Sequence, residues 1–340
     1  MYNKWLLAGS VIVLVILSAC NSNPLDIDVS TINVNMPIQR MEQALFAVKN
    51  QTQVDDLYKN YPLDFVEEYL YSLQTPEALD TTRLATINTY LRDTVTQKLY
   101  QDIQKEFTNI SSTQKEIEQA FQHIKYYYPT VYLPRVVSYL SNLQGNTISD
   151  SVIAIGLDSY LGKNYYMYPL AGFYDYQTTK MFPQQIPYHV VYSWAKLNFE
   201  APRNKYNALE AMVYEGKILY FMDAVFPDKE DSLKISYTGN QLQWCKNTEN
   251  DIWSYLIEKK LLYEENPLII NNLLADGPHT KYFATAASTQ DEAPARVGAW
   301  IGWQIIKSYM QKNKSITLQT LLQDTNLQAI FENSKYKPAK

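Results

Sequence analysis

The main apolar stretch in the body of the chain runs from Asn207 to Phe226 and consists of helix-forming residues. At 100° per residue its apolar side chains cover almost every side of the predicted helix, which is typical of a helix buried in a core. Four charged residues interrupt it: Glu210, Glu215, Lys217 and Asp223. Because burying an isolated charge is costly, each of them must be paired, hydrogen-bonded or turned toward a cleft.

Helical spacing of apolar residues recurs along most of the chain. It predicts helices at about 38–48, 62–72, 77–93, 95–106, 112–127, 188–199, 238–263, 295–312, 317–325 and 327–334. In the 295–312 helix, Gly298 and Gly302 stand four residues apart, and glycines at that spacing allow another backbone to approach closely. We expect the neighbouring backbone to be the 207–226 helix.

Two segments in the middle of the chain change the period. Residues 130–140 and 151–156 are rich in β-branched and aromatic side chains, and the turn-prone run 142–149 separates them. We interpret them as two antiparallel strands. The sequence therefore predicts an α+β protein, mainly helical with a small antiparallel sheet, that forms a single globular domain over residues 36–340.

The N-terminus has a third pattern, in which a short charged region precedes an apolar run too short for a permanent membrane span. The sequence Leu17-Ser-Ala-Cys20 resembles the lipobox of bacterial lipoproteins, where the signal is removed before a cysteine that is then acylated. We expect residues 1–19 to be a lipoprotein signal peptide, and residues 20–35 to be a lipidated N-terminus, carrying palmitate-type chains on Cys20, and a flexible tether. An ordinary cleaved signal with a chance cysteine is the alternative.

Charge and motif content narrow the function classes. The formal net charge is −5, and removing Lys4 with the signal makes the mature chain one unit more acidic, which argues against nucleic acid as a partner. Cys245, the second of two cysteines, is expected to be a small core residue. The three histidines, His123, His189 and His279, show no metal-ligand spacing, and HExxH, GxSxG and phosphate-loop motifs do not occur. We predict no metal and no cofactor.

The order of the predicted elements nevertheless resembles that of gluzincin-type zinc peptidases, which place an HExxH helix behind an antiparallel strand. On that pattern Leu209 and Val213 replace the two histidines and Glu210 is retained. The resulting hypothesis is a degenerate, catalytically inactive zincin-like scaffold around the central helix. The simpler interpretation of Glu210 is a buried carboxylate held by an Arg, Lys or Tyr of a neighbouring helix.

Five residues are candidates for a cleft in such a scaffold: Asp158, Glu210, Glu215, Arg296 and Trp300. Each has a structural alternative. Asp158 follows a predicted strand and is placed to cap the next helix. Glu215 precedes a possible kink at the following glycine, and Trp300 belongs to a group of aromatic residues that is typical of a core.

Five blocks of sequence occur in one order along the chain: 155–162 (IGLDSYLG, with the aromatic loop up to Pro169), 212–220 (MVYEGKILY), 237–263, 297–310 (VGAWIGWQIIKSYM) and 330–340 (IFENSKYKPAK). Together with the lipobox they resemble the gliding motility lipoprotein GldB family of the Bacteroidota. The resemblance implies an outer-membrane lipoprotein associated with gliding and with the type IX secretion apparatus, and it brings no established catalytic residues. The lack of an acidic run after Cys20 favours the side that faces the periplasm.

The predicted function is a non-catalytic accessory or assembly factor that is held at the membrane by acylated Cys20 and binds envelope protein partners or a peptide in its cleft. A first alternative is a metal-dependent hydrolase that uses carboxylates such as Glu210. A second is a glycan-binding lipoprotein, suggested by the tyrosine-rich loop Tyr165–Tyr176. Exposed tyrosine rings in that loop would support the glycan-binding alternative, and buried rings would exclude it.

Overall fold

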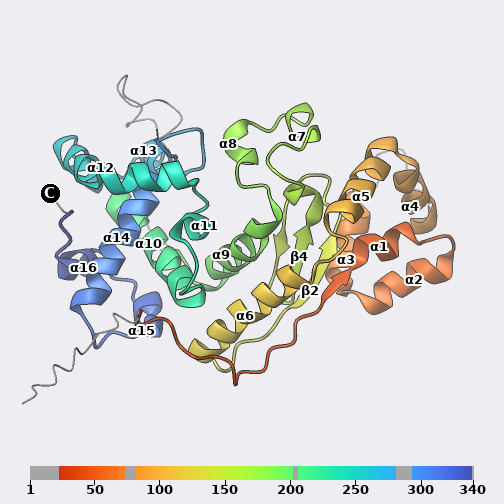
Figure 1. The fold of residues 1–340 in the computed structure, drawn as a ribbon, viewed down its shortest axis with the longest axis horizontal. Coiled ribbons are helices and arrows are strands. Elements are labelled where there is room, and N and C mark those ends of the chain that lie inside the picture. The colour runs from red at the N-terminus through yellow and green to blue at the C-terminus, as the bar shows by residue number, and fades with distance from the viewer. Residues whose placement is uncertain (1–22, 74–81, 202–205, 281–292, 339–340) are drawn as a thin grey trace, which may run out of the picture.

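The computed structural model describes residues 23–73, 82–201, 206–280 and 293–338. The predicted signal peptide and Cys20 lie outside these residues. Helices cover a small sheet near the middle of the molecule, and a helical lobe stands beside them (Figure 1). The prediction of a mainly helical α+β protein is confirmed.

The sheet has the strand order β1-β2-β4-β3. Its strands are β1 (Ile38–Arg40), β2 (Arg135–Tyr139), β3 (Thr147–Ile148) and β4 (Val152–Gly156). Both β1 and β4 run parallel to β2, whereas β3 pairs antiparallel with β4. The prediction that residues 130–140 and 151–156 pair antiparallel is therefore wrong. The turn-prone run contains β3, and the chain returns from it as β4 into the space between β2 and β3.

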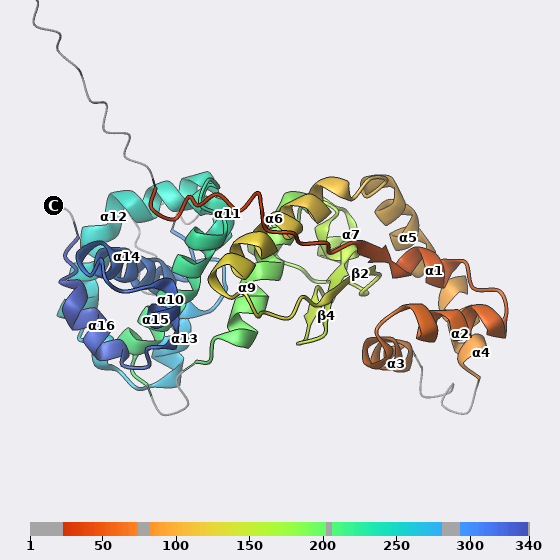
Figure 2. The same ribbon diagram turned by 90° about the horizontal axis from the view of Figure 1, so that it is seen from below.

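Helices cover both faces of this sheet (Figure 2). On one face, α1 (Met41–Phe46), α2 (Gln51–Asn60), α3 (Leu63–Ser72) and α4 (Arg83–Arg92) share a core with the alternate residues Val137, Tyr139, Val152 and Ala154. On the other face, Val136, Ile153 and Ile155 join the core of α5 (Thr94–Glu106), α6 (Ser111–Tyr127) and α9 (Ile186–Asn198). Burial of both faces explains why β4 is apolar without alternation.

The helical lobe is built on α10 (Ala208–Val225) and α14 (Val297–Lys312). As predicted, α10 is buried on nearly all sides. The predicted close approach of the two helices is also confirmed, because a Cβ on Gly302 would collide with the Met212 carbonyl and one on Gly216 with the Gly302 carbonyl. Gly298 has a different neighbour, Leu273 of α13.

Shorter elements complete the described chain. The lobe also contains α11 (Asp231–Ile235), α12 (Gly239–Glu258), the 3₁₀ turn η4 (Leu261–Tyr263), α13 (Pro267–Leu274), α15 (Leu318–Gln323) and α16 (Leu327–Ser334). Between β4 and α9 lie η2 (Leu157–Tyr160), α7 (Met167–Leu170), α8 (Asp175–Thr178) and η3 (Pro183–Gln185).

Residues 23–37, which we call the strap, lie against the protein body, although most of them were expected to form a flexible tether. The strap runs from the helical lobe along α6 to β1 (Figure 1). The Gln122 side chain donates to the Ile32 carbonyl at 2.8 Å, and the Met36 amide donates to the Glu118 carboxylate at 3.0 Å. Val34 and Met36 are buried in the main core. The strap backbone is thus held by long polar side chains of α6. Because these bonds involve the backbone of the strap, they require no apolar periodicity in its sequence.

Candidate functional site

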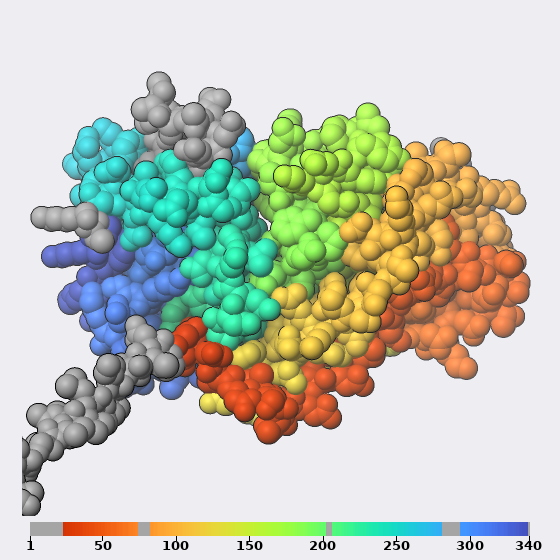
Figure 3. Space-filling view, viewed as in Figure 1, coloured from red at the N-terminus to blue at the C-terminus, as the bar shows by residue number. Residues whose placement is uncertain are grey.

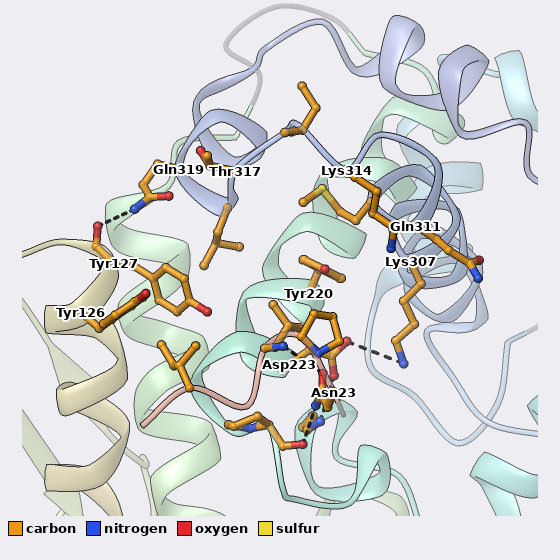
Figure 4. A pocket seen from close by; sticks show the side chains of 18 of the residues that line it. Asn23, Tyr126, Tyr127, Tyr220, Asp223, Lys307, Gln311, Lys314, Thr317 and Gln319 are labelled. Carbon is orange, nitrogen blue, oxygen red and sulfur yellow. Dashed lines mark hydrogen bonds and ion pairs between the residues drawn. The ribbon is translucent and has the colours of Figure 1, made fainter. Parts of the chain in front are cut away.

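A pocket of about 810 Å³ lies where the strap passes from the helical lobe to α6 (Figure 4). The surface view shows the strap lying across the junction between these two parts of the molecule (Figure 3). We call this the strap pocket. Its lining residues are Asn23, Pro24, Leu25, Ile27, Tyr126, Tyr127, Tyr220, Asp223, Pro227, Lys229, Asp231, Lys234, Lys307, Met310, Gln311, Lys314, Ile316, Thr317, Leu318 and Gln319.

The strap is fixed at the pocket by its first described residue. The Asn23 side-chain amide donates to the Pro227 carbonyl at 3.0 Å, and the Leu25 amide donates back to the Asn23 side chain at 3.1 Å. Leu25 packs against the main core. The wall that the strap contributes is therefore held by both polar and apolar contacts.

Two aspartates and two lysines form a charged network in the lining. Lys234 Nζ lies 2.9 Å from Asp223 Oδ1 and 3.4 Å from Asp231 Oδ1. Lys307 Nζ lies 3.1 Å from Asp231 Oδ2 and 3.7 Å from Asp223 Oδ2, and it stands 3.8 Å from the centre of the Trp303 ring. The Trp303 indole N–H donates to Asp223 Oδ2 at 2.7 Å. Every charge of the network has an opposite partner.

The two carboxyl groups of this network titrate differently because of their burial. Burial raises the pKa of Asp223, against the attraction of Lys307 and Lys234. Burial also acts upward on Asp231, but Lys307 and Lys234 outweigh it and lower the pKa of that carboxyl. Asp231, the more exposed of the two carboxylates, is the more firmly ionised.

Other parts of the lining supply positive charge and hydroxyl donors. Lys314 forms no ion pair within the part of the chain that the structure describes, and Lys229 Nζ is 3.7 Å from the carboxylates of both Glu116 and Asp228. Burial raises the pKa of both Tyr127 and Tyr220 to about 12, so both phenols keep their protons at neutral pH. With four lysines against two aspartates, the lining has an excess of positive charge suited to an acidic group.

None of the predicted cleft residues lies in this pocket, although the charge of Asp223 within an apolar helix was a sequence feature that pointed to it. It was one of the four charges that the apolar character of α10 required to be satisfied. All four have partners in the structure: the Asn207 amide for Glu210, Lys234 for Asp223, Lys196 for Glu215, and the Asp324 carbonyl, at 2.7 Å, for Lys217. The lysines opposite Asp223 come from distant positions, and no local pattern connects them.

Asp158 lies outside the strap pocket and is fully buried. Its carboxylate accepts hydrogen bonds from the Ser141 amide at 2.9 Å, from the Ser141 hydroxyl at 2.8 Å and from the Leu143 amide. Burial raises its pKa, while these bonds act in the opposite direction. Asp158 thus anchors the loop after β2, and it does not serve the following helix as the cap that its position suggested.

Glu210 takes part in a capping box at the start of α10. Its carboxylate accepts from the Asn207 amide at 3.0 Å, and the Asn207 side chain accepts from the Glu210 amide at 3.0 Å. Both the capping role and the parallel pairing of β2 with β4 leave the zincin-like scaffold without support. Among the described residues, no group of three or more His, Cys, Asp or Glu side chains is placed to hold a metal ion.

Glu215 and Arg296 are the two predicted cleft residues that the structure brings together. Arg296 lies 3.7 Å from Glu215, and Tyr192 connects them by donating to Glu215 at 2.6 Å and accepting from Arg296 at 2.9 Å. Burial opposes ionisation of Glu215, but Lys196 and Arg296 hold its pKa below the usual value. These groups form a buried network between α9, α10 and the start of α14.

Trp300 is buried and packs edge-to-face on Trp303, with ring centres 5.8 Å apart. Its indole N–H has no hydrogen-bond partner among the described residues. Cys245 is also fully buried, as predicted for a core residue. None of the five predicted cleft residues lines the strap pocket or any other main pocket of the described residues.

The tyrosine-rich loop is divided between the core and the surface. Tyr168 is fully buried, and Tyr165 donates to Asp102 at 2.8 Å. Tyr174 is 68% exposed, and its ring stacks on that of Tyr176 with centres 5.9 Å apart. These two rings line a pocket of about 660 Å³ together with Asp175, Thr179, Thr238, Gln241, Pro278 and His279.

The fold and the strap pocket define a mainly helical α+β protein in which an N-terminal strap forms one wall of a lysine-rich pocket. The family model described as gliding motility protein GldB matches residues 22–338. The chain belongs to this family, which confirms the resemblance of its sequence blocks and associates it with gliding motility. Comparison with curated proteins and with solved structures gave no match. No helix within residues 23–73, 82–201, 206–280 and 293–338 is long and apolar enough to cross a membrane.

Proposed function

We propose that this protein is a non-catalytic accessory or assembly factor of the gliding and type IX secretion machinery. In this proposal acylated Cys20 anchors it to the outer membrane on the periplasmic side. The strap pocket then docks an acidic segment of a partner envelope protein. The observation that carries the proposal is the strap itself, because one segment both leads to the anchor and forms a wall of the positively charged pocket.

The position of the strap limits how far the pocket can be from the membrane. Asn23 is three positions after Cys20, so even a fully extended chain spans about 10 Å between them. A partner bound in the strap pocket is then held close to the membrane surface. This arrangement suits a factor that assembles other envelope proteins more than a freely diffusing one.

The excess of lysines over aspartates in the strap pocket defines the chemistry of the partner. The network of Asp223, Asp231, Lys234 and Lys307 is internally balanced. Lys314, which forms no ion pair with a described residue, and Lys229, whose contacts with Glu116 and Asp228 are long at 3.7 Å, are the lysines that attract an external charge. An acidic side chain or a chain-terminal carboxylate matches these lysines and the phenol donors of Tyr127 and Tyr220. Charge complementarity of this kind sets association rate and partner choice.

The proposal is tested by complementation of a gliding strain that lacks the native gene. Cys20→Ala is expected to release the protein from the membrane fraction and to abolish gliding. Lys229→Glu combined with Lys314→Glu is expected to stay in the membrane fraction and still abolish gliding. Lys246→Glu, at an exposed lysine of α12, is the matched control and should glide normally. Normal gliding by the double variant would refute pocket docking.

We also propose glycan binding as a second candidate function, supported by the exposed Tyr174 and the half-buried Tyr176 on which its ring stacks. Exposed aromatic faces bordered by polar side chains suit the apolar face of a sugar ring, and Gln241 and Thr238 border these rings. Binding of chitohexaose and maltohexaose, measured by calorimetry, should be lost in Tyr174→Ala. The control Tyr71→Ala changes another highly exposed tyrosine and should retain it. Absence of binding to the unaltered protein removes this candidate.

A further inference from the structure

A second polar cavity, of about 310 Å³, lies at the carboxyl ends of the parallel strands β2 and β4. We call it the strand-end cavity. The loop after β2 and the η2 turn after β4 form one side, and the α8 segment and α9 form the other. It shares no lining residue with the strap pocket. Carboxyl ends of parallel strands are the usual ligand-binding edge of such sheets, because the loops that follow the strands converge there.

The charges around this cavity cancel. Lys180 forms an ion pair with Asp276. His189 hydrogen-bonds through Nδ1 to the Tyr160 hydroxyl at 3.0 Å and through Nε2 to the Ser236 hydroxyl at 3.3 Å. Burial lowers the pKa of His189 to about 3, so the ring is neutral at physiological pH. A lining without net charge favours a neutral ligand over an ion.

The cavity also contains a buried hydroxyl that lacks a partner. Ser159 is 6% exposed, and its Oγ forms no hydrogen bond with any described residue. A buried hydroxyl in this state destabilises the folded protein, because it has lost water and gained nothing in return. Gln177 also lines the cavity, and its side-chain oxygen accepts from the Tyr174 amide at 2.9 Å. Its side-chain nitrogen donates to no described residue. The unused groups are hydroxyl and amide, which bind hydroxyl-rich ligands.

One part of the lining is apolar. Phe173 lies in the loop before α8, where its ring packs near Tyr168 with centres 5.8 Å apart. An aromatic ring in the same lining as hydroxyl and amide groups matches the two kinds of surface on a sugar ring. The volume admits one such ring, since pockets for drug-sized ligands begin at about 300 Å³.

We propose that the strand-end cavity binds a single neutral sugar unit, with Ser159 and Gln177 bonding its hydroxyl groups and Phe173 covering its apolar face. This inference deepens the glycan-binding candidate and rests on it for biological meaning. The cavity and the pocket of the Tyr174–Tyr176 pair share no lining residue. The two sites are therefore separable by substitution.

The test uses the mature chain with Cys20→Ser, which removes the acylation site and leaves every described residue unchanged. Saturation-transfer NMR and calorimetry are performed with N-acetylglucosamine, with glucose and with glucose 6-phosphate. We expect saturable binding of at least one neutral sugar in the millimolar range and weaker binding of the phosphate. Ser159→Ala should weaken neutral-sugar binding about fivefold or more while the thermal midpoint stays equal or rises, because the substitution removes an unsatisfied buried group.

Tyr174→Ala distinguishes this inference from the second candidate function. This substitution should leave monosaccharide binding unchanged. If it abolishes hexasaccharide binding alone, the result bears on the Tyr174–Tyr176 site and not on the strand-end cavity. The inference is overturned if neither neutral sugar binds up to 50 mM, if the phosphate binds more tightly than glucose, or if Ser159→Ala retains full affinity. Gln177→Ala, at a half-buried residue of α8, provides a second check and should also weaken sugar binding.

Discussion

At the scale of single residues, the four charged side chains of the apolar helix α10 show how buried charges are tolerated in this protein. The apolar surroundings of Glu210, Glu215, Lys217 and Asp223 required partners, and the structure supplies one for each. The identity of those partners depends on tertiary packing, which has no local sequence signal. The apolar pattern therefore does not distinguish Glu210, whose carboxylate caps α10, from Asp223, which belongs to the strap pocket.

The first prediction concerns the buried pair of Asp223 and Lys234. Asp223→Asn removes the carboxylate that faces a lysine side chain only 4% exposed. Asp231 remains 3.4 Å from Lys234 Nζ, so the buried charge keeps one partner but loses its closer one, and we expect a loss of about 2 kcal/mol in the free energy of unfolding. Urea denaturation measures this loss. Asp251→Asn, at an exposed site, should change it by less than about 0.5 kcal/mol, and an equally small effect at Asp223 would show that the pair is unimportant.

The second prediction concerns pH. Folding lowers the pKa of His189 from 6.5 to about 3, so below pH 6.5 the unfolded chain binds a proton that the folded chain does not. Stability contributed by neutral His189 is complete above pH 6.5 and decreases as the pH falls toward 3, by at most about 1.4 kcal/mol per pH unit. Unfolding free energies measured from pH 7 to 4 should fall less steeply in His189→Asn. Parallel curves for the two proteins would contradict this assignment.

At the scale of elements, the glycine spacing on α14 predicted a close helix contact, and the contact exists at Gly302. The sheet was harder to predict. Residues 130–140 and 151–156 were recognised as strands, but apolar alternation says nothing about the direction of the partner strand. The decisive element, β3, is two residues long and lies within a segment that otherwise has turn composition.

The third prediction tests the α10–α14 contact. Gly302→Ala places a methyl group against the Met212 carbonyl, and neither backbone is free to move away inside the core. We expect destabilisation of about 3 kcal/mol or more, seen as a lower urea midpoint. Gly239→Ala is the matched control because a Cβ there meets no atom within 4 Å. This control should be neutral or slightly stabilising, whereas equal effects at both glycines would contradict tight packing at Gly302.

At the scale of the whole molecule, the ordered blocks of sequence identified the family, and the helical content and central helix followed from apolar periodicity. The strap did not, since residues 23–35 lack periodicity and their partners are side chains of α6 and the Pro227 carbonyl. The strap pocket was missed for the same reason. It is made of surfaces contributed by segments from residue 23 to residue 319.

The strap links the fold to the proposed function because it forms a wall of the strap pocket and follows closely after Cys20, which is the anchor in that proposal. A fourth prediction follows for the strap. Asn23→Ala removes the hydrogen bond to the Pro227 carbonyl and should increase protease cleavage within residues 23–31. The free energy of global unfolding should fall by no more than about 1 kcal/mol. Unchanged cleavage would show that this contact does not hold the strap.

The most direct test of the central claim is site-specific photo-crosslinking in gliding cells. A photoreactive residue replaces Gln311, whose exposed side chain lines the strap pocket, and another replaces Lys246 as the control. The account predicts an adduct from position 311 alone, with a partner segment of net negative charge identified by mass spectrometry, and its loss when Lys229→Glu and Lys314→Glu are added. An adduct that survives the charge reversal, or none at position 311, would contradict docking of an acidic partner in the strap pocket.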